Sequence, residues 1–161
     1  MTLRSSTLVV AGLGFCASVL AGASMAWAMT VPRIEHAATL KECGGCHMVY
    51  SPQLLPQRSW DAIMSHLDDH FGEVATMDEA VRMDVLSYLL ANAIDAPGSK
   101  AGDRLLRGIK PDEVPVRITA LPWFQRRHGE VNFTNIKSTP VKSPANCIGC
   151  HKTADKGEFY E

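Results

Sequence analysis

The amino-acid sequence predicts a mainly α fold, and three observations support this prediction. Apolar residues recur at helical spacing across residues 59–93. No segment alternates apolar and polar residues over a useful strand length. Prolines and glycines are frequent after residue 95 and allow only short helices there. We therefore expect regular helices in the first part of the chain and a loop-rich second part.

The first part carries the stronger helix signals. Residues 32–47 are expected to be helical. Ser59 is a suitable N-cap for a helix that runs to about Phe71, where Gly72 favours a stop.

A further helix is predicted from Met77 to about Ala93. Thr76 and Glu79 form a capping box before it, in which each side chain bonds the backbone amide of the other residue. The apolar stripe of this helix consists of Val81, Val85, Leu86, Leu89 and Leu90.

A break near Ala96-Pro97-Gly98-Ser99 divides the chain into predicted domains at 29–97 and 98–161. We expect the second domain to be largely irregular. Its predicted pieces are short helices at 100–107 and 120–131, an extended segment at 132–145, a short helix capped by Ser143, and a loose polar tail at 156–161.

Residues 1–28 have the features of a secretory signal peptide. Arg4 supplies positive charge, Leu8 to Ala23 form an uncharged apolar run, and Ala26-Trp27-Ala28 is a small-x-small cleavage site. We expect cleavage after Ala28 and export to the periplasm. The alternative is an uncleaved membrane anchor, because the apolar run approaches the roughly 20 residues that span a bilayer.

The chain that remains after cleavage has a formal charge of −2, because all 17 acidic residues but only 15 basic ones lie in it. A nucleic-acid-binding protein would show a basic patch or stripe. The sequence has no such run, so we expect no nucleic-acid partner.

The cysteines indicate the chemistry of the chain. Cys16 leaves with the signal peptide, and the other four cysteines lie in two C-x-x-C-H motifs. This motif attaches c-type haem: the two thiols add across the porphyrin vinyl groups, and the histidine becomes the proximal iron ligand. The sequence therefore predicts two covalently bound haem c groups. The motifs are Cys43-Gly44-Gly45-Cys46-His47 and Cys147-Ile148-Gly149-Cys150-His151.

Disulfides, a zinc site and a thioredoxin-like redox pair are alternative uses of a C-x-x-C pair. Two such pairs can form a four-thiolate zinc site. That site would not explain a histidine directly after both second cysteines, and secretion disfavours free structural thiolates. We therefore favour haem attachment.

The sixth ligand decides whether a haem iron carries electrons or binds small molecules. On the predicted helices, His128 lies inside the apolar sector, and His70 lies at its margin, about 75° from the centre. His66 lies about 115° from the centre, toward solvent, and we interpret His36 as a surface residue. The alternative is that His70 and His128 are ordinary half-buried histidines with hydrogen-bond partners.

Methionine is the other common sixth ligand. Met83 is the best methionine candidate for the first haem, because Met64 suits core packing and Met77 lies in a first helical turn. No methionine lies between Ala93 and Cys147. The second haem is therefore expected to bind His128, unless a ligand crosses from the other domain.

Several segments, at the motifs and between them, match the sequence pattern of one known protein family. They are Cys43 to Trp60, His70-Phe71-Gly72-Glu73, Tyr88 to Ala93, Pro122-Trp123 leading to His128, and Cys147 to Lys152. On these segments the sequence resembles the bacterial dihaem cytochrome c family. Its members are found beside a small high-spin cytochrome, the sphaeroides haem protein, and a membrane cytochrome b.

The resemblance implies a class I cytochrome c-like N-terminal half and an irregular C-terminal half around a second haem. It also implies low-spin irons with two histidine ligands each, and electron transfer to the high-spin cytochrome. From proximity in sequence, we expect His47 to pair with His70 and His151 with His128. An exchange of ligands between the halves stays open.

Three functions fit these features, and we favour the first. It is a periplasmic electron carrier of comparatively low potential, without enzymatic activity or a small-molecule substrate, that accepts electrons from a membrane cytochrome b-type donor. The second is a small dihaem peroxidase or gas-binding haem protein with one open iron site. The third is an electron-entry subunit of a larger periplasmic reductase.

Overall fold

The computed structural model describes residues 29–99, 102–136 and 139–160. This part of the chain is rich in helix and has little strand, which confirms the mainly α prediction. The predicted signal peptide lies outside the described residues. The α-helices are α1 (Ala37–Cys43), α2 (Gln57–Met64), α3 (Glu79–Ala91), α4 (Gly102–Leu105), α5 (Pro122–Arg127) and α6 (Cys147–Cys150). Short 3-10 helices are η1 (Pro52–Leu54), η2 (Leu67–Asp69), η3 (Ile118–Ala120) and η5 (Ala154–Lys156), and the strands are β1 (Met29–Thr30) and β2 (Glu158–Phe159).

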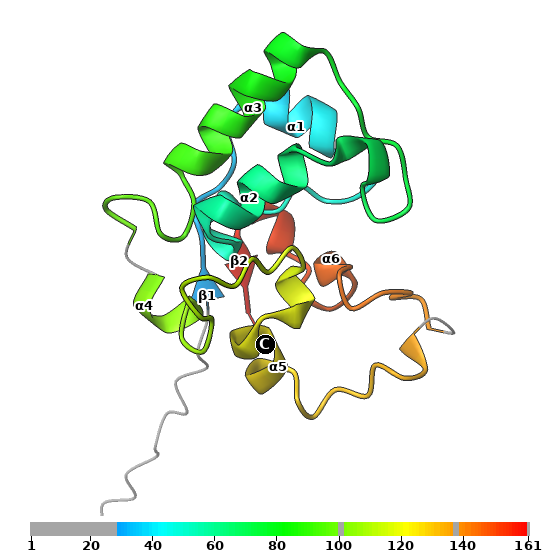
Figure 1. Ribbon diagram of the computed structural model, residues 1–161. Helices are drawn as coiled ribbons and strands as arrows, with labels where there is room; N and C mark the ends of the chain where they lie inside the picture. The colour runs from blue at the N-terminus through cyan, green and yellow to red at the C-terminus, as the bar shows by residue number, and fades with distance from the viewer. Residues whose placement is uncertain (1–28, 100–101, 137–138, 161) are drawn as a thin grey trace, which may run out of the picture.

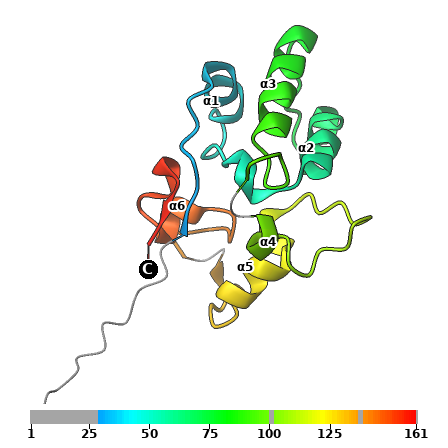
Figure 2. The same cartoon turned by 90° about the vertical axis from the view of Figure 1, so that its left-hand side faces the viewer.

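These elements form two tiers (Figures 1 and 2). The helices α1, α2 and α3 lie together in the upper tier, and α4, α5, α6 and the two strands lie below them. The upper-tier helices α1, α2 and α3 lie within residues 29–97. The strand β1, with which the described residues begin, lies in the lower tier.

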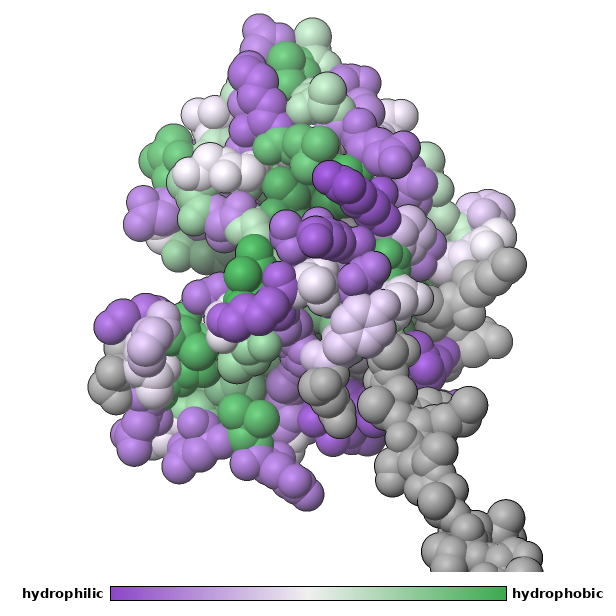
Figure 3. Space-filling model, turned by 180° about the vertical axis from the view of Figure 1, so that it is seen from behind, coloured by the Kyte–Doolittle hydropathy of each residue, from purple (hydrophilic) through white to green (hydrophobic). Residues whose placement is uncertain are grey.

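The surface mixes polar and apolar residues. On the face shown in Figure 3, apolar residues gather in the upper part among hydrophilic ones. Among the residues that the structure describes, no helix has the length and apolarity required to cross a bilayer.

The helix α3 supplies the centre of the upper core. Its residues Val85, Leu86 and Leu89 are buried, as the predicted stripe requires, and Trp60 and Met64 of α2 belong to the same cluster. Burial of one such side chain contributes about 1.5–3 kcal/mol. This shared cluster therefore stabilises the packing of α2 against α3.

The upper core continues into the lower tier. Leu121 and Phe124, at the start of α5, belong to the same buried cluster as Trp60. In addition, the Arg58 side chain of α2 donates to the carbonyl oxygen of Glu113 over 2.6 Å. The two parts of the chain are thus joined by apolar packing as well as by hydrogen bonds.

The two short strands join the ends of the described chain. They pair antiparallel, with Met29 opposite Phe159, and the Val31 amide donates to the Gly157 carbonyl over 2.8 Å. Gly157 has a φ of 81°, and a side chain there would collide with the Val31 carbonyl. The predicted loose tail at 156–161 is wrong for the described residues, because the tail pairs with the start of the chain.

The helix α2 begins earlier than predicted. Its first residue is Gln57, whose amide donates to Asp95 Oδ1 over 2.7 Å. The predicted N-cap, Ser59, is buried inside the helix. A carboxylate that is distant in sequence therefore satisfies the first free amide of this helix.

The same helix also ends earlier than predicted, at Met64 rather than near Phe71. Leu67 is buried, and its carbonyl accepts from the Ala75 amide over 2.8 Å. This contact draws the chain into η2 and a turn, so the helical pattern does not continue. His70 consequently lies in a turn and not on a helix face.

The helix α3 begins two residues later than predicted. Its N-cap is Asp78, whose carboxylate accepts from the Ala80 amide over 2.9 Å. Thr76 is exposed and lies outside the helix, so the predicted capping box is wrong. The Glu79 carboxylate instead pairs with Arg82, one turn later, over 2.7 Å.

The other predicted helices are also shorter in the structure. Residues 32–36 are irregular, and His36 is the N-cap of α1, with its ring accepting from the Thr39 amide. The described residues of 132–145 form turns and bends, not an extended segment. Ser143 does not cap α6, because that role belongs to Asn146, whose side chain accepts from the Gly149 amide.

Candidate functional site

The first C-x-x-C-H motif follows directly from α1. Cys43 is the last residue of that helix and is half-buried, whereas Cys46 and His47 lie on the exposed turn after it. Burial raises the pKa of the Cys43 thiol, and the nearby Glu42 carboxylate raises it further. The Nδ1 atom of His47 donates to the Met48 carbonyl over 2.6 Å. This bond leaves Nε2 free to bind a metal.

His70 approaches the first motif from a tight turn between η2 and α3. Its amide donates to the Glu73 carbonyl over 2.7 Å, and the Glu73 amide returns a bond of 3.3 Å. The central residues Phe71 and Gly72 have φ values of 58° and 99°, as a type I′ turn requires. Burial lowers the pKa of the His70 imidazole, and proximity to His47 lowers it further.

The rings of His47 and His70 lie opposite each other across a gap. Their centres are 6.2 Å apart, and the ring planes differ by 25°. Two imidazole nitrogens at about 2.0 Å from one metal ion place their ring centres roughly 6 Å apart. The separation therefore fits one iron between the two rings and is too large for direct stacking.

The second motif forms α6 and the residue after it. Cys147 and Cys150 are the first and last residues of this short helix, and His151 follows as its C-cap. The Nδ1 atom of His151 donates to the Tyr160 carbonyl over 2.9 Å. The C-terminal strand region thus orients this histidine and leaves its Nε2 free.

His128 opposes the second motif from the end of α5. Its Nδ1 atom donates to the Phe124 carbonyl over 3.0 Å, and its ring stacks on the Phe124 ring at 4.0 Å. The ring centres of His128 and His151 are 6.1 Å apart, with perpendicular planes. This separation also fits one iron between two imidazoles.

A cavity of about 350 Å³ lies between these two histidines. Its wall is mostly apolar and aromatic, which suits a large planar apolar group. Both cysteines of the second motif line it, so the attachment atoms and the two imidazoles face one space. The lining includes Trp123, Phe124, His128, Val131, Phe133, Val141, Cys147, Cys150, His151 and Phe159.

The remaining ligand candidates lie elsewhere. His36 is half-buried, stacks on Tyr88 at 4.6 Å and approaches the Asp84 carboxylate at 3.4 Å. The prediction of a free surface residue is therefore wrong for His36. His66 is exposed, as expected, and its Nδ1 donates to the Ala62 carbonyl.

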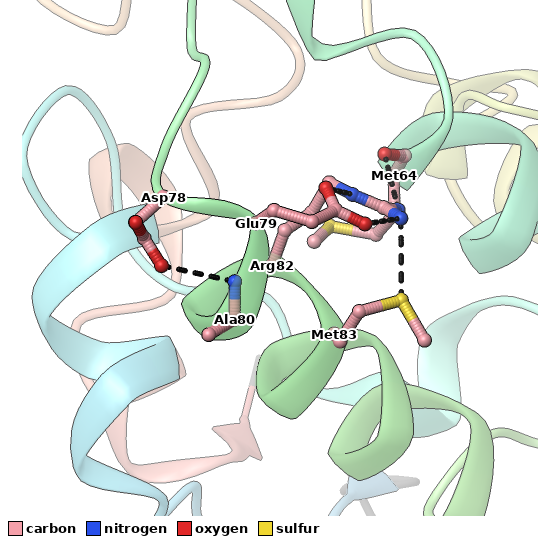
Figure 4. A network of polar contacts seen from close by, with 6 residues as sticks. All are labelled: Met64, Asp78, Glu79, Ala80, Arg82 and Met83. Carbon is pink, nitrogen blue, oxygen red and sulfur yellow. Dashed lines mark hydrogen bonds and ion pairs between the residues drawn. The ribbon is translucent and has the colours of Figure 1, made fainter.

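Met83, the methionine candidate, is half exposed on α3. Its sulfur lies 3.2 Å from the Arg82 guanidinium, in the network drawn in Figure 4. The same guanidinium binds Glu79 and the Met64 carbonyl. Met64 itself is buried in the core, as expected.

Tyr50 is a residue that the sequence did not indicate. Its ring lies 4.9 Å from the His47 ring, and its hydroxyl donates to the Ala145 carbonyl over 2.7 Å. Burial, together with the nearby Cys147, raises the pKa of Tyr50 to about 12. Tyr50 therefore connects the first motif with the segment before the second, and no local pattern could have revealed a contact across that distance in sequence.

A family model for dihaem cytochrome c matches residues 39–159, which include both motifs and both opposing histidines. The chain belongs to the dihaem cytochrome c family. Its two haem c groups are covalently attached, as the motifs predicted. Among curated proteins, none matches this dihaem cytochrome.

Solved structures agree with this assignment. A dihaem cytochrome c from Rhodobacter sphaeroides is 41% identical, with a TM-score of 0.72 over 80% of this chain and 100% of that one. A dihaem cytochrome c from Shewanella baltica OS155 is 31% identical, with a TM-score of 0.58 over 75% of this chain and 84% of that one. The fold of this dihaem cytochrome is therefore that of its family.

Proposed function

We propose that this dihaem cytochrome is a periplasmic electron carrier whose two irons are each held between two histidines. The observation that carries the proposal is the equal spacing of two histidine pairs, 6.2 Å at the first motif and 6.1 Å at the second. Each pair combines a motif histidine with one from outside the motif. The proposed axial ligands are His47 with His70, and His151 with His128.

The protein's own residues supply attachment, orientation and exclusion of other ligands. Cys43 and Cys46 hold the first haem and Cys147 and Cys150 the second. Backbone carbonyls fix the rings of three of the four histidines through Nδ1 and so leave Nε2 available for the iron. When bound, each haem iron supplies one-electron chemistry between its ferric and ferrous states. With imidazoles on both sides, that change needs little rearrangement of the ligands.

The ligand set also supports comparatively low reduction potentials. Thioether ligands raise the potential of haem iron. Met83 points its sulfur at Arg82, and neither histidine pair includes a methionine. A low-potential carrier suits electron flow from a membrane cytochrome b-type donor to a periplasmic acceptor such as a small high-spin cytochrome, and we propose both as partners.

Location and domain organisation belong to the same proposal. The signal-peptide features of residues 1–28 support export to the periplasm. The ranges 29–97 and 98–161 each contain one motif and its opposing histidine, so we propose one haem for each range.

The ferric and ferrous spectra test this function. A carrier with both irons closed should give purely low-spin spectra and should not bind carbon monoxide on mixing. His128→Ala should convert one of the two haems to a high-spin, carbon monoxide-binding form. The control is His66→Ala, which removes an exposed histidine that opposes no motif.

Rapid carbon monoxide or cyanide binding by the unmodified protein would contradict the proposal. It would favour the alternative, a small dihaem peroxidase or gas-binding protein with one open iron. An unchanged spectrum in the His128→Ala variant would show that His128 is not an iron ligand.

A further inference from the structure

The charges of this chain are unevenly distributed. Residues 29–97 contain ten acidic and four basic side chains, whereas residues 98–161 contain seven acidic and eleven basic ones. No lysine or arginine lies between Arg58 and Arg82, but six acidic residues do. His70 lies within that acidic stretch.

The distal loop, which we define as residues 65–76 between α2 and α3, brings this charge to the surface beside His70. Asp68, Asp69 and Glu73 are exposed. In the same loop, Phe71 and Val74 are 46% and 77% exposed. Exposed apolar side chains next to charged ones are typical of protein–protein contact surfaces.

Two guanidinium groups approach the distal loop from other elements. Arg117 lies 4.2 Å above the Phe71 ring. Arg82 lines a shallow hollow together with Asp68, but it is already paired with Glu79. Neither forms an ion pair with an acidic side chain of the loop within the described chain, so the loop keeps an excess of negative charge.

We propose that the distal loop is the docking surface for a redox protein with a basic patch. The inference rests on the proposed function, because it assumes that His70 is an iron ligand. Electron-transfer complexes have small, weak interfaces that depend on charge steering. A basic partner is drawn to this loop and repelled by the basic second part of the chain. It therefore docks with its redox centre next to the first haem and away from the second.

Charge reversal on the loop tests this surface. The probe is oxidised mitochondrial cytochrome c, a basic redox protein, mixed with the reduced dihaem protein in stopped flow. Asp68→Lys with Glu73→Lys should lower the bimolecular rate constant at low salt by about fivefold or more, because rim charges act on association. The effect should disappear at high salt, where surface charges are screened.

The matched control places the same charge change elsewhere. Glu130→Lys with Asp155→Lys alters two exposed acidic residues of the second part, and it should change the rate constant less than twofold. Asp68→Asn with Glu73→Gln should give an intermediate rate and serves if the reversed variant folds poorly. Asp69 is left unchanged because its carboxylate accepts from the Gly72 amide.

Equal rates for the two lysine variants would overturn the proposal, since only net charge would then matter. Self-association of the unmodified protein at low salt, lost in the loop variant, would also overturn it and assign the loop to a second copy of this chain. The low-spin spectrum of each variant separates this test from the proposed function. A loop variant that stays low-spin but reacts at the rate of the unmodified protein would disprove the docking surface and leave the proposed electron-carrier function intact.

Discussion

His47 and His70 hold their ring planes within 25° of each other, whereas the planes of His128 and His151 are perpendicular. The difference arises from local backbone. The Nδ1 of His47 bonds the carbonyl of the next residue, while the rings of His128 and His151 are turned by the Phe124 and Tyr160 carbonyls. The two histidine pairs, which we propose as iron ligands, therefore differ in the relative orientation of their rings.

This difference should be visible in electron paramagnetic resonance. The relative orientation of two axial imidazoles sets the splitting of the iron d orbitals, and perpendicular rings leave two of these orbitals nearly equal in energy. We expect two distinct low-spin ferric signals from the oxidised protein, with the larger maximal g value at the His128–His151 site. His128→Ala should abolish that signal alone. One common signal for both sites would contradict the assigned ring orientations.

Tyr50 offers a second test at the residue scale. Tyr50→Phe keeps the ring beside His47 but removes the hydrogen bond to the Ala145 carbonyl. Loss of a part-buried hydrogen bond should lower the free energy of unfolding by about 1 kcal/mol, measured by denaturant titration. Tyr160→Phe is the control, because Tyr160 is 49% exposed, and it should be nearly neutral. Equal stability of both variants would show that the Tyr50 hydroxyl does not hold the two parts together.

The residue types alone predicted two covalently attached haem groups, because the C-x-x-C-H spacing is specific for haem attachment. The prediction of His70 and His128 as sixth ligands had a weaker basis. The angle assigned to His70 assumed a helix through Phe71, but His70 lies in a turn. That turn requires a positive φ at Phe71, and a bulky residue gives no signal for such a conformation.

At the scale of elements, helix existence could be predicted but helix ends could not. The cap of α2 comes from Asp95, far along the chain, and its end depends on the bond between Leu67 and Ala75. Such contacts become visible only when distant segments are packed. The two-residue strands were missed for the same reason, since each is too short to form a pattern of its own.

The start of α3 can be tested directly with two variants. Asp78→Ala removes the carboxylate that accepts from the Ala80 amide and should cost about 1 kcal/mol of stability. Thr76→Ala, at the predicted cap, should change the stability by less than about 0.5 kcal/mol, as expected for an exposed loop residue. Denaturant titration of both variants decides the assignment. A larger loss of stability in Thr76→Ala than in Asp78→Ala would show that Thr76 is the N-cap.

At the scale of the whole molecule, the two tiers share a buried apolar cluster, and this has a consequence for unfolding. Leu121 is 2% exposed and belongs to the cluster built on α2 and α3. Leu121→Ala should therefore destabilise both tiers by about 2–5 kcal/mol. Haem absorbance and far-ultraviolet circular dichroism should report one common transition, shifted to lower denaturant.

Val114→Ala is the control for this experiment, because Val114 is 45% exposed and its truncation should be nearly neutral. Two separate transitions, of which only one moves in Leu121→Ala, would show that the ranges 29–97 and 98–161 unfold independently. The sequence break near residue 97 could not decide this question, since a break in helical pattern does not reveal whether a core continues across it.

The pairing of β1 with β2 also constrains how the protein matures. Translation proceeds from the N-terminus, so Met29 can pair only after Phe159, far along the chain, has been made. By then the first motif and His70 have long been made, whereas the bond that orients His151 can form only after Tyr160 has been made. We therefore expect the cofactors to be acquired in chain order, with closure of the β-ribbon as the step that completes assembly of the newly made protein.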